Sequence, residues 1–277
     1  MSGHRGFIGR HLVEALQASQ AVVSSIEGDV CSPRAWNGQF DTLYHLAAAM
    51  PDRFADDASS GFYINIGGVV QALEACRERG AHMVFISTCG VYSPSAVGAL
   101  GEDALEEPQT PYAQSKLMGE KLCREYADHY RVKCTVLRLF NVYGSGQRSP
   151  YLIPYLLECA VAGREAVVNQ PHSGRDFIYI ADVVNALKLA VLQQDLYEVF
   201  NIGFGRPYTV SEVITAIEST SGKTVAWTEK EHGGKIEATT YYANADRACE
   251  RLKWRPVVEI AHGLEKTFAA VADVRPG

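Results

Sequence analysis

Gly3-His-Arg-Gly6-Phe-Ile-Gly9 stands at the start of the chain and spaces three glycines three residues apart. A helix is expected directly after it, through residues 12–17. Glycines in such a place permit a tight turn and let the backbone approach a pyrophosphate, which binds at the amino end of the helix. The spacing therefore predicts a dinucleotide-binding turn, although an ordinary glycine-rich tail would contain the same residues.

The segment before this turn is unusually short. A turn of this kind normally follows the central strand of its sheet, and only Met1 and Ser2 precede Gly3. We expect the first strand to be missing or truncated, with weak cofactor binding or marginal stability unless another segment fills its place.

The residues that would meet the rest of a dinucleotide are less clearly defined. An acidic residue about 20 positions after the turn usually binds the ribose, and Glu27 and Asp29 lie near that spacing. Asp29-Val30 also resembles a pair that flanks an adenine. Arg5 and Arg10 would either meet a 2′-phosphate or be solvated. The choice between NAD and NADP therefore stays open.

Short apolar runs alternate with helical patterns through the first half of the chain. This alternation predicts an α/β fold, a Rossmann-type doubly wound parallel sheet covered by helices on both faces. Gly80 directly follows the expected helix 64–79 and provides a natural end for it. The expected strands are 21–26, 41–47, 83–87 and 134–140, and the expected helices are 64–79 and 112–130.

The order of elements changes after Asn141-Val-Tyr-Gly144. Helices 151–162, 180–192, 210–219 and 260–272 and strands 166–168 and 198–202 predict a smaller mixed α/β lobe. We expect residues 1–144 to form a dinucleotide-binding domain and residues 145–277 to form mainly a substrate-binding lobe. Segments near 175–205 are expected to return to the first domain.

Tyr112-Ala-Gln-Ser-Lys116 places a phenol and an ammonium on one face of a helix. A neighbouring lysine stabilises a phenolate and lowers the pKa of the phenol from its ordinary value near 10. Tyr112 is therefore a candidate acid or base toward a sugar or alcohol hydroxyl. Any amphipathic helix can carry the same pair, and the functional interpretation depends on its combination with the glycine turn and with Ser87-Thr88, at the end of an apolar strand.

Composition limits the classes of function. A net charge of −6 and a pI near 5.8 argue against a nucleic-acid surface, and no apolar run has the length of a membrane span. The seven cysteines include no Cys-x-x-Cys pair. We therefore expect neither a metal site nor a disulfide framework, and reduced thiols in a cytoplasm.

Further motifs follow in order along the chain: Tyr44-His-Leu-Ala-Ala48, Asn65, Ser87-Thr88, Arg138-Leu-Phe-Asn141-Val-Tyr-Gly144 and Gly174-Arg-Asp-Phe-Ile-Tyr-Ile-Ala-Asp182. Together with the glycine turn and the Tyr112/Lys116 pair, they make the chain resemble the extended short-chain dehydrogenase/reductase family, in its NAD-dependent nucleotide-sugar epimerase/dehydratase branch. The resemblance covers nearly the whole chain.

This resemblance implies NAD or NADP as cofactor and a nucleotide-diphosphate sugar as substrate. It implies that Tyr112 moves the proton, that Ser87 or Thr88 hydrogen-bonds the sugar oxygen, and that Lys116 binds the nicotinamide ribose, while the cofactor carries the hydride chemistry. The implied cofactor contacts are Gly3, Arg5, Gly6, Phe7, Ile8, Gly9, Asp29, Val30, Leu46, Ala47, Ala48, Asn65, Tyr112, Lys116 and Phe140. The implied substrate contacts are Thr88, Asn141, Tyr151 and Arg175.

Cys89 and Gly90 separate the reactions found within the family. The 4,6-dehydratases carry Asp-Glu directly after the threonine, so Cys89-Gly90 argues against dehydration. GDP-fucose synthases resemble the chain locally and use an equivalent cysteine as an epimerising base, with a histidine as its partner acid. Tyr151 stands in place of that histidine, and Cys89 could equally be a small buried residue.

The leading hypothesis is therefore a nucleotide-sugar epimerase that acts by transient oxidation at sugar C4. A nucleotide-sugar 4-ketoreductase that uses Cys89 as an additional catalytic residue is the alternative within the same class. A non-catalytic cofactor- or sugar-nucleotide-binding relic is the alternative from another class. The resemblance also implies a homodimer that pairs helices 64–79 and 112–130. The sequence does not identify the sugar or the nucleotide.

Overall fold

Four strands with buried side chains on both faces form a parallel sheet, as expected for a sheet covered on both sides. The computed structural model describes residues 1–230 and 238–272 and orders these strands β1-β2-β4-β8. The strands are β1 (Thr42–His45), β2 (His82–Thr88), β4 (Cys134–Leu139) and β8 (Tyr197–Ile202). The predicted Rossmann-type parallel sheet is confirmed.

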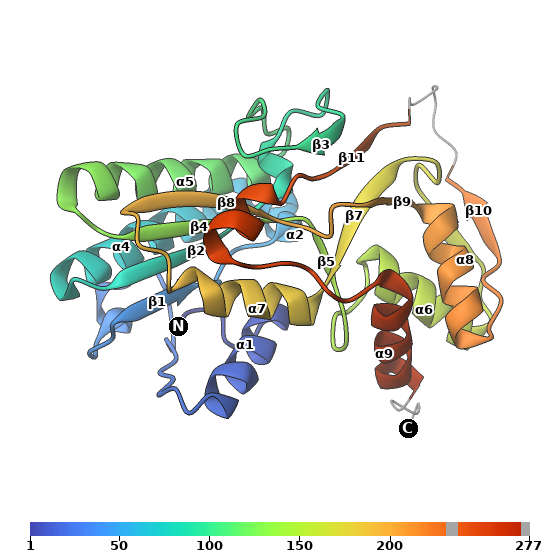
Figure 1. Ribbon diagram of the computed structural model, residues 1–277, viewed down its shortest axis with the longest axis horizontal. Helices are drawn as coiled ribbons and strands as arrows, with labels where there is room; N and C mark the ends of the chain where they lie inside the picture. The colour runs from blue at the N-terminus through green and yellow to red at the C-terminus, as the bar shows by residue number, and fades with distance from the viewer. Residues whose placement is uncertain (231–237, 273–277) are drawn as a thin grey trace.

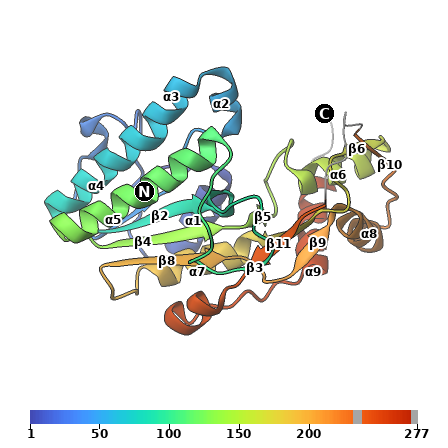
Figure 2. The same cartoon turned by 90° about the horizontal axis from the view of Figure 1, so that it is seen from above.

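Helices cover both faces of this sheet (Figures 1 and 2). One face carries α4 (Gly68–Arg79) and α5 (Pro111–Tyr130), and the other carries α1 (Phe7–Ala18) and α7 (Ile180–Ala190). The side chains of β2 alternate between these faces: Met83 and Phe85 belong to one buried cluster, and Val84 and Ile86 belong to the other. The alternation follows from the period-2 geometry of a strand.

The chain has only Met1 and Ser2 at the place of the first strand. The Ser2 amide donates to the Tyr44 carbonyl at 3.0 Å, and the Ile26 amide donates to the Met1 carbonyl at 2.8 Å. The predicted strand 21–26 is wrong, because these residues have no regular secondary structure and Val22 is 98% exposed. A strand needs a hydrogen-bonded neighbour along its length, and Met1 contacts this segment through Ser24 and Ile26.

A second sheet begins where β4 ends, after the single residue Phe140. Its order is β3-β11-β7-β5, and β9 pairs antiparallel with β7. The strands are β3 (Gly98–Leu100), β5 (Asn141–Tyr143), β7 (Gly174–Tyr179), β9 (Pro207–Thr209) and β11 (Thr240–Ala243). Beside it lie the paired strands β6 (Ala166–Val168) and β10 (Trp227–Glu229) and the helices α6 (Leu152–Ala162), α8 (Val210–Ser221) and α9 (Ile260–Ala272).

Shorter helical segments connect these elements. They are α2 (Pro51–Asp56), α3 (Ala58–Phe62), the 3-10 turns η1 (Pro33–Trp36) and η3 (Cys89–Val91), and the π-helical turns η2 (Tyr63–Gly67) and η4 (Ala248–Leu252). The predicted helix 64–79 thus starts with a π turn before α4. It ends at Gly80, whose φ of +64° lies in the left-handed region, as predicted.

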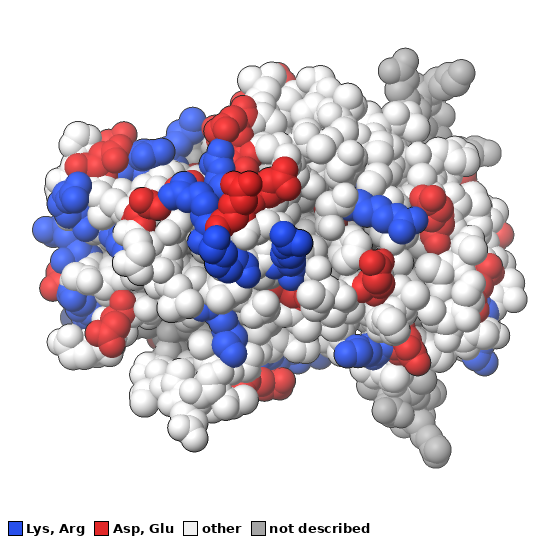
Figure 3. Space-filling view, in the orientation of Figure 1, with Lys and Arg blue, Asp and Glu red and all other residues white. Residues whose placement is uncertain are grey.

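The carboxyl ends of β2 and β4 face the smaller part of the molecule (Figure 2), and β1 runs parallel to β2. Ligands of open parallel sheets bind at this edge. Within residues 1–230 and 238–272, no helix is long and apolar enough to cross a bilayer, and no three His, Cys, Asp or Glu side chains are grouped to hold a metal. The cysteines are free. Figure 3 shows basic and acidic side chains gathered together over η4 and β8, where Arg247 and Arg251 pair with Glu198.

Candidate active site

The glycine turn lies directly against the loop that follows β1. Gly3 has a φ of +71°, and a Cβ on it would lie 2.6 Å from the Ala47 nitrogen. A Cβ on Gly9 would lie 2.2 Å from the Gly3 carbonyl oxygen. A side chain at either position is therefore excluded by backbone atoms, and the sequence motif is explained by the close approach that the turn makes.

The amino end of α1 starts at this turn. Gly6 is the residue before the helix and has no side chain to accept from the first amides, and Phe7 and Ile8 pack their side chains against the core. These amides and the positive end of the helix dipole can receive a phosphate. Arg5 lies beside the turn and pairs with Glu27 at 2.7 Å.

Asn65 connects the loop after β1 with the start of α5. Its Oδ1 accepts from the Ala49 amide at 2.7 Å, and its Nδ2 donates to the Ser115 hydroxyl at 2.8 Å. Ser115 in turn donates to the Tyr112 carbonyl at 2.7 Å. The π turn η2 presents Asn65 to this loop, and such turns are frequent at functional sites. Leu46 and Ala47, which precede Ala48 in this loop, are held beside the glycine turn by Ser2, whose carbonyl and hydroxyl accept from their amides at 3.4 and 3.2 Å.

Asp29 and Val30 lie in the segment that connects α1 to η1. Asp29 Oδ1 accepts from the Cys31 amide at 2.9 Å and so stabilises its own loop. The Val30 carbonyl accepts from the Trp36 indole at 2.9 Å, and its side chain lies close to Gly68 in α4. Val30 therefore borders the start of α4, directly after the π turn that carries Asn65.

Tyr112 and Lys116 lie in the first turns of α5. Thr110 caps the helix by accepting from the Ala113 amide at 3.1 Å, and Pro111 starts it. Lys116 is buried, donates to the Ile86 carbonyl at 2.8 Å, and has its ammonium 5.9 Å from the centre of the Tyr112 ring. The predicted pairing of phenol and ammonium on one helix face is present.

The expected lowering of the Tyr112 pKa is not found. Burial raises the pKa of this phenol, and the neighbouring Tyr151 and Cys89 raise it further. Burial also lowers the pKa of Lys116 to about 8, against the opposing effect of Glu120. The prediction from the sequence was wrong on this point because it counted the charge of the lysine and not the desolvation of both groups.

The end of β2 divides the predicted Ser87-Thr88 pair. Ser87 is buried and donates to the carboxylate of Glu120 on α5, whereas Thr88 Oγ1 accepts from the Gly90 amide at 3.1 Å. Ser87 is therefore occupied by a side chain of the protein, and Thr88 is the hydroxyl of the pair that lies at the edge of the sheet.

Cys89 follows Thr88 and borders the apolar cluster of Val91, Leu117 and Phe140. Burial raises the pKa of its thiol to about 12, Asp176 raises it and Arg175 lowers it. A thiolate, which a cysteine base requires, is therefore disfavoured near neutral pH.

A cavity of about 480 Å³ lies between α6, β7 and α8 in the smaller part. Asn141 and Arg175 line it, and Asn141 also donates to the Asp176 carbonyl at 2.9 Å. The guanidinium of Arg175 lies over the ring of Tyr241 at 4.5 Å, a neighbour that the sequence did not suggest. Tyr151 is half-exposed at the start of α6, near Tyr112.

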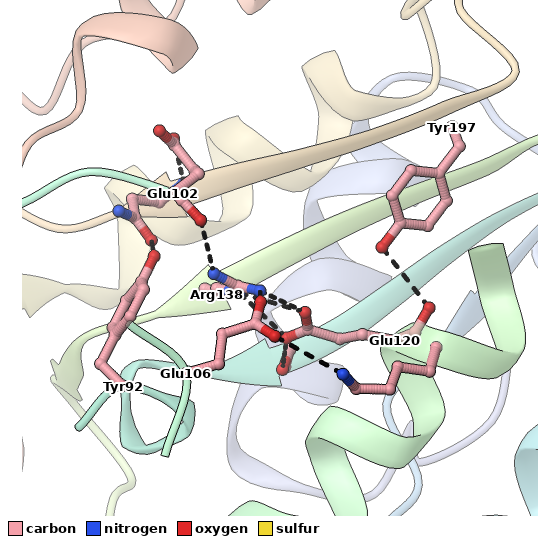
Figure 4. A network of polar contacts seen from close by, with 9 residues as sticks. Tyr92, Glu102, Glu106, Glu120, Arg138 and Tyr197 are labelled. Atoms are coloured by element: carbon pink, nitrogen blue, oxygen red, sulfur yellow. Dashed lines mark hydrogen bonds and ion pairs between the residues drawn. The ribbon is translucent and has the colours of Figure 1, made fainter. Parts of the chain in front are cut away.

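Two charged residues beneath the site form a pair that the sequence did not suggest, although Arg138 belongs to one of its motifs. Glu120 and Arg138 are both buried, and Arg138 Nη2 donates to Glu120 Oε2 at 2.7 Å (Figure 4). The sequence contains one signal for Glu120, because a carboxylate four residues after Lys116 falls on the same helix face.

Phe140 was predicted as a cofactor contact. Its side chain is buried in the apolar cluster beside Cys89.

Comparisons with known proteins identify the family of the chain. Residues 1–203 match the model of the NAD dependent epimerase/dehydratase family. An uncharacterised UDP-glucose epimerase of Bacillus subtilis is 30% identical over 244 residues, which are 86% of this chain and 76% of that protein. The family match covers the glycine turn, β2, α5 and β8.

Solved structures give the same result. The UDP-glucose 4-epimerase of Thermotoga maritima with UDP-glucose has a TM-score of 0.90 and 26% identity, covering 98% of this chain and 97% of that one. A variant of the UDP-glucuronic acid 4-epimerase of Bacillus cereus, solved with UDP-4-deoxy-4-fluoro-glucuronic acid and NAD, has a TM-score of 0.90 and 26% identity, covering 99% and 98%. The chain belongs to the NAD-dependent epimerase/dehydratase family, within the extended short-chain dehydrogenases/reductases.

Proposed function

We propose that this protein is an NAD(P)-dependent nucleotide-sugar epimerase that acts by transient oxidation at C4 of the sugar. The observation that carries the proposal is that Lys116 donates to the Ile86 carbonyl near the end of β2, at the carboxyl edge of the sheet, and that Tyr112 lies near Cys89, the residue directly after Thr88. The glycine turn lies at the same edge, and the cavity lined by Asn141 and Arg175 lies in the adjoining part. Proton transfer, cofactor and sugar nucleotide would therefore meet at one place.

The residues present fit a dinucleotide. The turn 3–9 leaves no room for a Cβ at Gly3 or Gly9, and no side chain of Gly6 caps the amides at the start of α1. We assign the pyrophosphate to Gly3, Gly6 and Gly9 and the nicotinamide ribose to Lys116. Asp29, Val30 and the loop 46–48 would hold the remainder. Bound there, NAD or NADP supplies the acceptor and donor of the hydride.

The side chains of this chain then have distinct roles. Tyr112 takes the proton of the sugar 4-hydroxyl and returns it, acting as base and then as acid. Thr88 hydrogen-bonds the same oxygen. Lys116 has its ammonium 5.9 Å from the centre of the Tyr112 ring, and a charged ammonium there would favour the phenolate. Asn65 holds the loop and helix in register by its bonds to Ala49 and Ser115.

We assign the nucleotide-diphosphate part of the substrate to the smaller lobe. Arg175 offers a cation at the cavity, and Asn141 offers an amide. Tyr151 stands in sequence between the lining residues Pro150 and Leu152 and lies near Tyr112. The proposed division is a cofactor-binding domain of residues 1–144 and a mainly substrate-binding lobe of residues 145–277. The segment 175–205 includes β8, which pairs with β4 in the larger sheet.

The experiment that tests the function uses the purified protein without added cofactor. UDP-glucose and UDP-glucuronic acid are supplied as probes, and their 4-epimers are separated and measured. We expect epimer formation with no net change in NADH or NADPH absorbance, and NAD released on denaturation. Net consumption of NADPH would support a 4-ketoreductase, and absence of any turnover with cofactor bound would support the non-catalytic relic.

Cys89 is tested separately as an epimerising base. A 4-keto sugar nucleotide incubated with the protein in deuterated water would gain deuterium at the carbons beside the ketone if a base lies over them. Because burial raises the pKa of Cys89 to about 12, we expect little exchange. Rapid exchange that Cys89→Ser abolishes would support the ketoreductase with an epimerising cysteine.

We further propose a homodimer in the cytoplasm. Val69, Leu73 and Cys123 are buried against the sheet, but Met118 is 43% exposed and Tyr63 is exposed on the outer side of η2 and α5. A second copy would cover these exposed side chains in a dimer. Light scattering at micromolar concentration should give twice the chain mass, and a monomer mass would reject the dimer. The free cysteines suit a reducing compartment.

A further inference from the structure

We propose that Glu120 is a positioning residue that fixes Thr88 relative to Tyr112 by holding Ser87. The inference rests on the proposed function and concerns residues that take no direct part in its chemistry. It starts from the observation that α5 is attached to the end of β2 by two of its own side chains, one helical turn apart.

The first attachment is Lys116 and the second is Glu120. Lys116 donates to the Ile86 carbonyl at 2.8 Å, and the carboxylate of Glu120 accepts from the Ser87 hydroxyl. Successive side chains of a strand point to opposite sides, so holding Ser87 toward α5 determines the side to which Thr88 points. Because Tyr112 lies on α5, the same attachments set the separation between the proposed proton-transfer group and the proposed hydroxyl.

Glu120 is itself held in place by Arg138 of β4. Arg138 Nε donates to both carboxylate oxygens at 3.1 Å, and Nη2 donates at 2.7 Å (Figure 4). The guanidinium also donates to the Glu102 carbonyl at 3.0 Å and to the carboxylate of Glu106. One cation thus joins β4, α5 and the loop that leads into α5.

Burial makes this arrangement rigid. Ser87, Glu120 and Arg138 are buried, and a carboxylate and a guanidinium removed from water need each other as partners. Figure 4 shows Glu106 and Glu120 converging on Arg138 with Tyr92 beside it, and the guanidinium lies 5.0 Å from the centre of the Tyr92 ring. Substitution of Glu120 therefore has two effects at once. It frees the Ser87 hydroxyl, and it removes a contact through which Arg138 holds α5.

Glu120 also acts on the charge of Lys116. The titratable groups that face Lys116 are Glu120 and Cys123 from its own helix, Tyr112, and His45 from β1. Of these, Glu120 contributes most to keeping the lysine protonated, against the burial that lowers its pKa to about 8. Loss of the carboxylate charge would lower the pKa of Lys116 further and move the alkaline limit of activity to lower pH.

The test is a double-mutant cycle of Glu120→Gln and Ser87→Ala in the holoenzyme. We expect Glu120→Gln to lower kcat roughly 10- to 100-fold, with KM nearly unchanged, an alkaline limit at lower pH, and faster amide exchange in residues 86–90. If Glu120 acts through Ser87, Ser87→Ala should cost less in the Glu120→Gln background than alone. The matched control is Glu125→Gln, an exposed carboxylate of the same helix.

Three outcomes overturn the proposal. These are an unchanged kcat per folded enzyme, full additivity of the two substitutions, and unchanged exchange in residues 86–90. If Glu120→Gln does not fold, Glu120→Asp replaces it in the cycle, because it keeps the charge for Arg138 and withdraws the carboxylate from Ser87. Tyr112→Phe is measured in parallel: retained activity there rejects the proposed function, whereas lost activity with an additive cycle rejects only the positioning role.

Discussion

The junction of β2 with α5 and the segment 21–27 both border the candidate site, but they are held in opposite ways. At the junction, Ser87, Lys116, Glu120 and Arg138 are all exposed by 3% or less. At the segment, Val22 is 98% exposed, and the side chains of the Arg5–Glu27 pair are exposed by 79% and 62%. Buried polar contacts fix a geometry, whereas exposed ion pairs are weak and screened by salt.

This difference separates proton transfer from cofactor binding, two functions proposed for the carboxyl edge of the larger sheet. The groups proposed to move the proton lie where the structure tolerates little displacement. Asp29 and Val30, which are proposed to hold part of the cofactor, closely follow the exposed segment, whose backbone bonds Met1 through Ser24 and Ile26. Substitutions should therefore change stability and kcat at the junction, and cofactor affinity by small factors at the segment.

The largest expected effect follows Arg138→Met. Removal of the guanidinium leaves Glu120 as a buried charge without its partner, which should cost about 3–5 kcal/mol of unfolding free energy. Arg77→Met is the control, since Arg77 forms an exposed pair with Glu74 at 2.6 Å and its loss should change the unfolding free energy far less. Urea denaturation measures both. Similar losses in the two variants would contradict the distinction between the regions.

Tyr112→Phe should have the next largest effect, on the reaction itself. Loss of a positioned acid and base should lower kcat at least roughly 100-fold, or about 2.7 kcal/mol of barrier. The ring remains, including its edge contact with Phe54 at 6.4 Å, so the fold and the cofactor affinity should persist. Tyr130→Phe, at an exposed position of the same helix, is the control. Activity within a few-fold of the wild type would reject the assignment.

The same two regions show what the sequence could predict. At the junction, the strands, α5 and the Tyr112/Lys116 pair were predicted, because periodicity, Pro111 and helix spacing are local signals. Ser87 was grouped with Thr88 because adjacency in sequence does not reveal that the two hydroxyls have different hydrogen-bond partners. Arg138 was known only as part of a motif, since its carboxylate partners come from distant parts of the chain.

At the segment 21–27 the local signal failed. Ala-Val-Val-Ser-Ser-Ile has the composition of a strand, but a strand is stable only with a neighbour, and the sequence does not show which one is available. The prediction that the pKa of Tyr112 is lowered was wrong for a related reason. Spacing gives the identity of a neighbouring charge, whereas desolvation depends on everything packed around the group.

His45 lies between the two regions and gives a pH-dependent prediction. Burial first, and then the positive charges of Lys116 and the amino terminus, lower its pKa from 6.5 to about 3. The unfolded chain therefore binds a proton between these values and the folded chain does not. The contribution of His45 to the unfolding free energy is therefore present above pH 6.5 and is lost as the pH falls toward 3. Between pH 6.5 and 5 the loss should be about 2 kcal/mol.

The measurement compares the unfolding free energy of the wild type and His45→Gln at these two pH values. Only the pH-dependent part is compared, because the substitution also removes contacts with the rings of Trp36 and Phe85. We expect a smaller slope in the variant. His129→Gln, at an exposed position, should keep the slope of the wild type. An equal slope in His45→Gln would show that His45 is not the group that titrates.

The smallest expected effect belongs to Glu27→Gln at the exposed segment. Glu27 pairs with Arg5 at 2.7 Å and with His4 at 3.2 Å, and an acidic group there would accept from the ribose hydroxyls of NAD and repel the 2′-phosphate of NADP. Loss of one exposed charge is worth about 0.2–1 kcal/mol, so NAD affinity should fall only a few-fold while NADP affinity rises. Titration of both cofactors measures the ratio, with Glu14→Gln on α1 as control. Since the proton-transfer groups lie at the buried junction, kcat at saturating cofactor should not change. A large fall in kcat would mean that the exposed segment and the buried junction are mechanically linked, which would contradict the separation from which these predictions start.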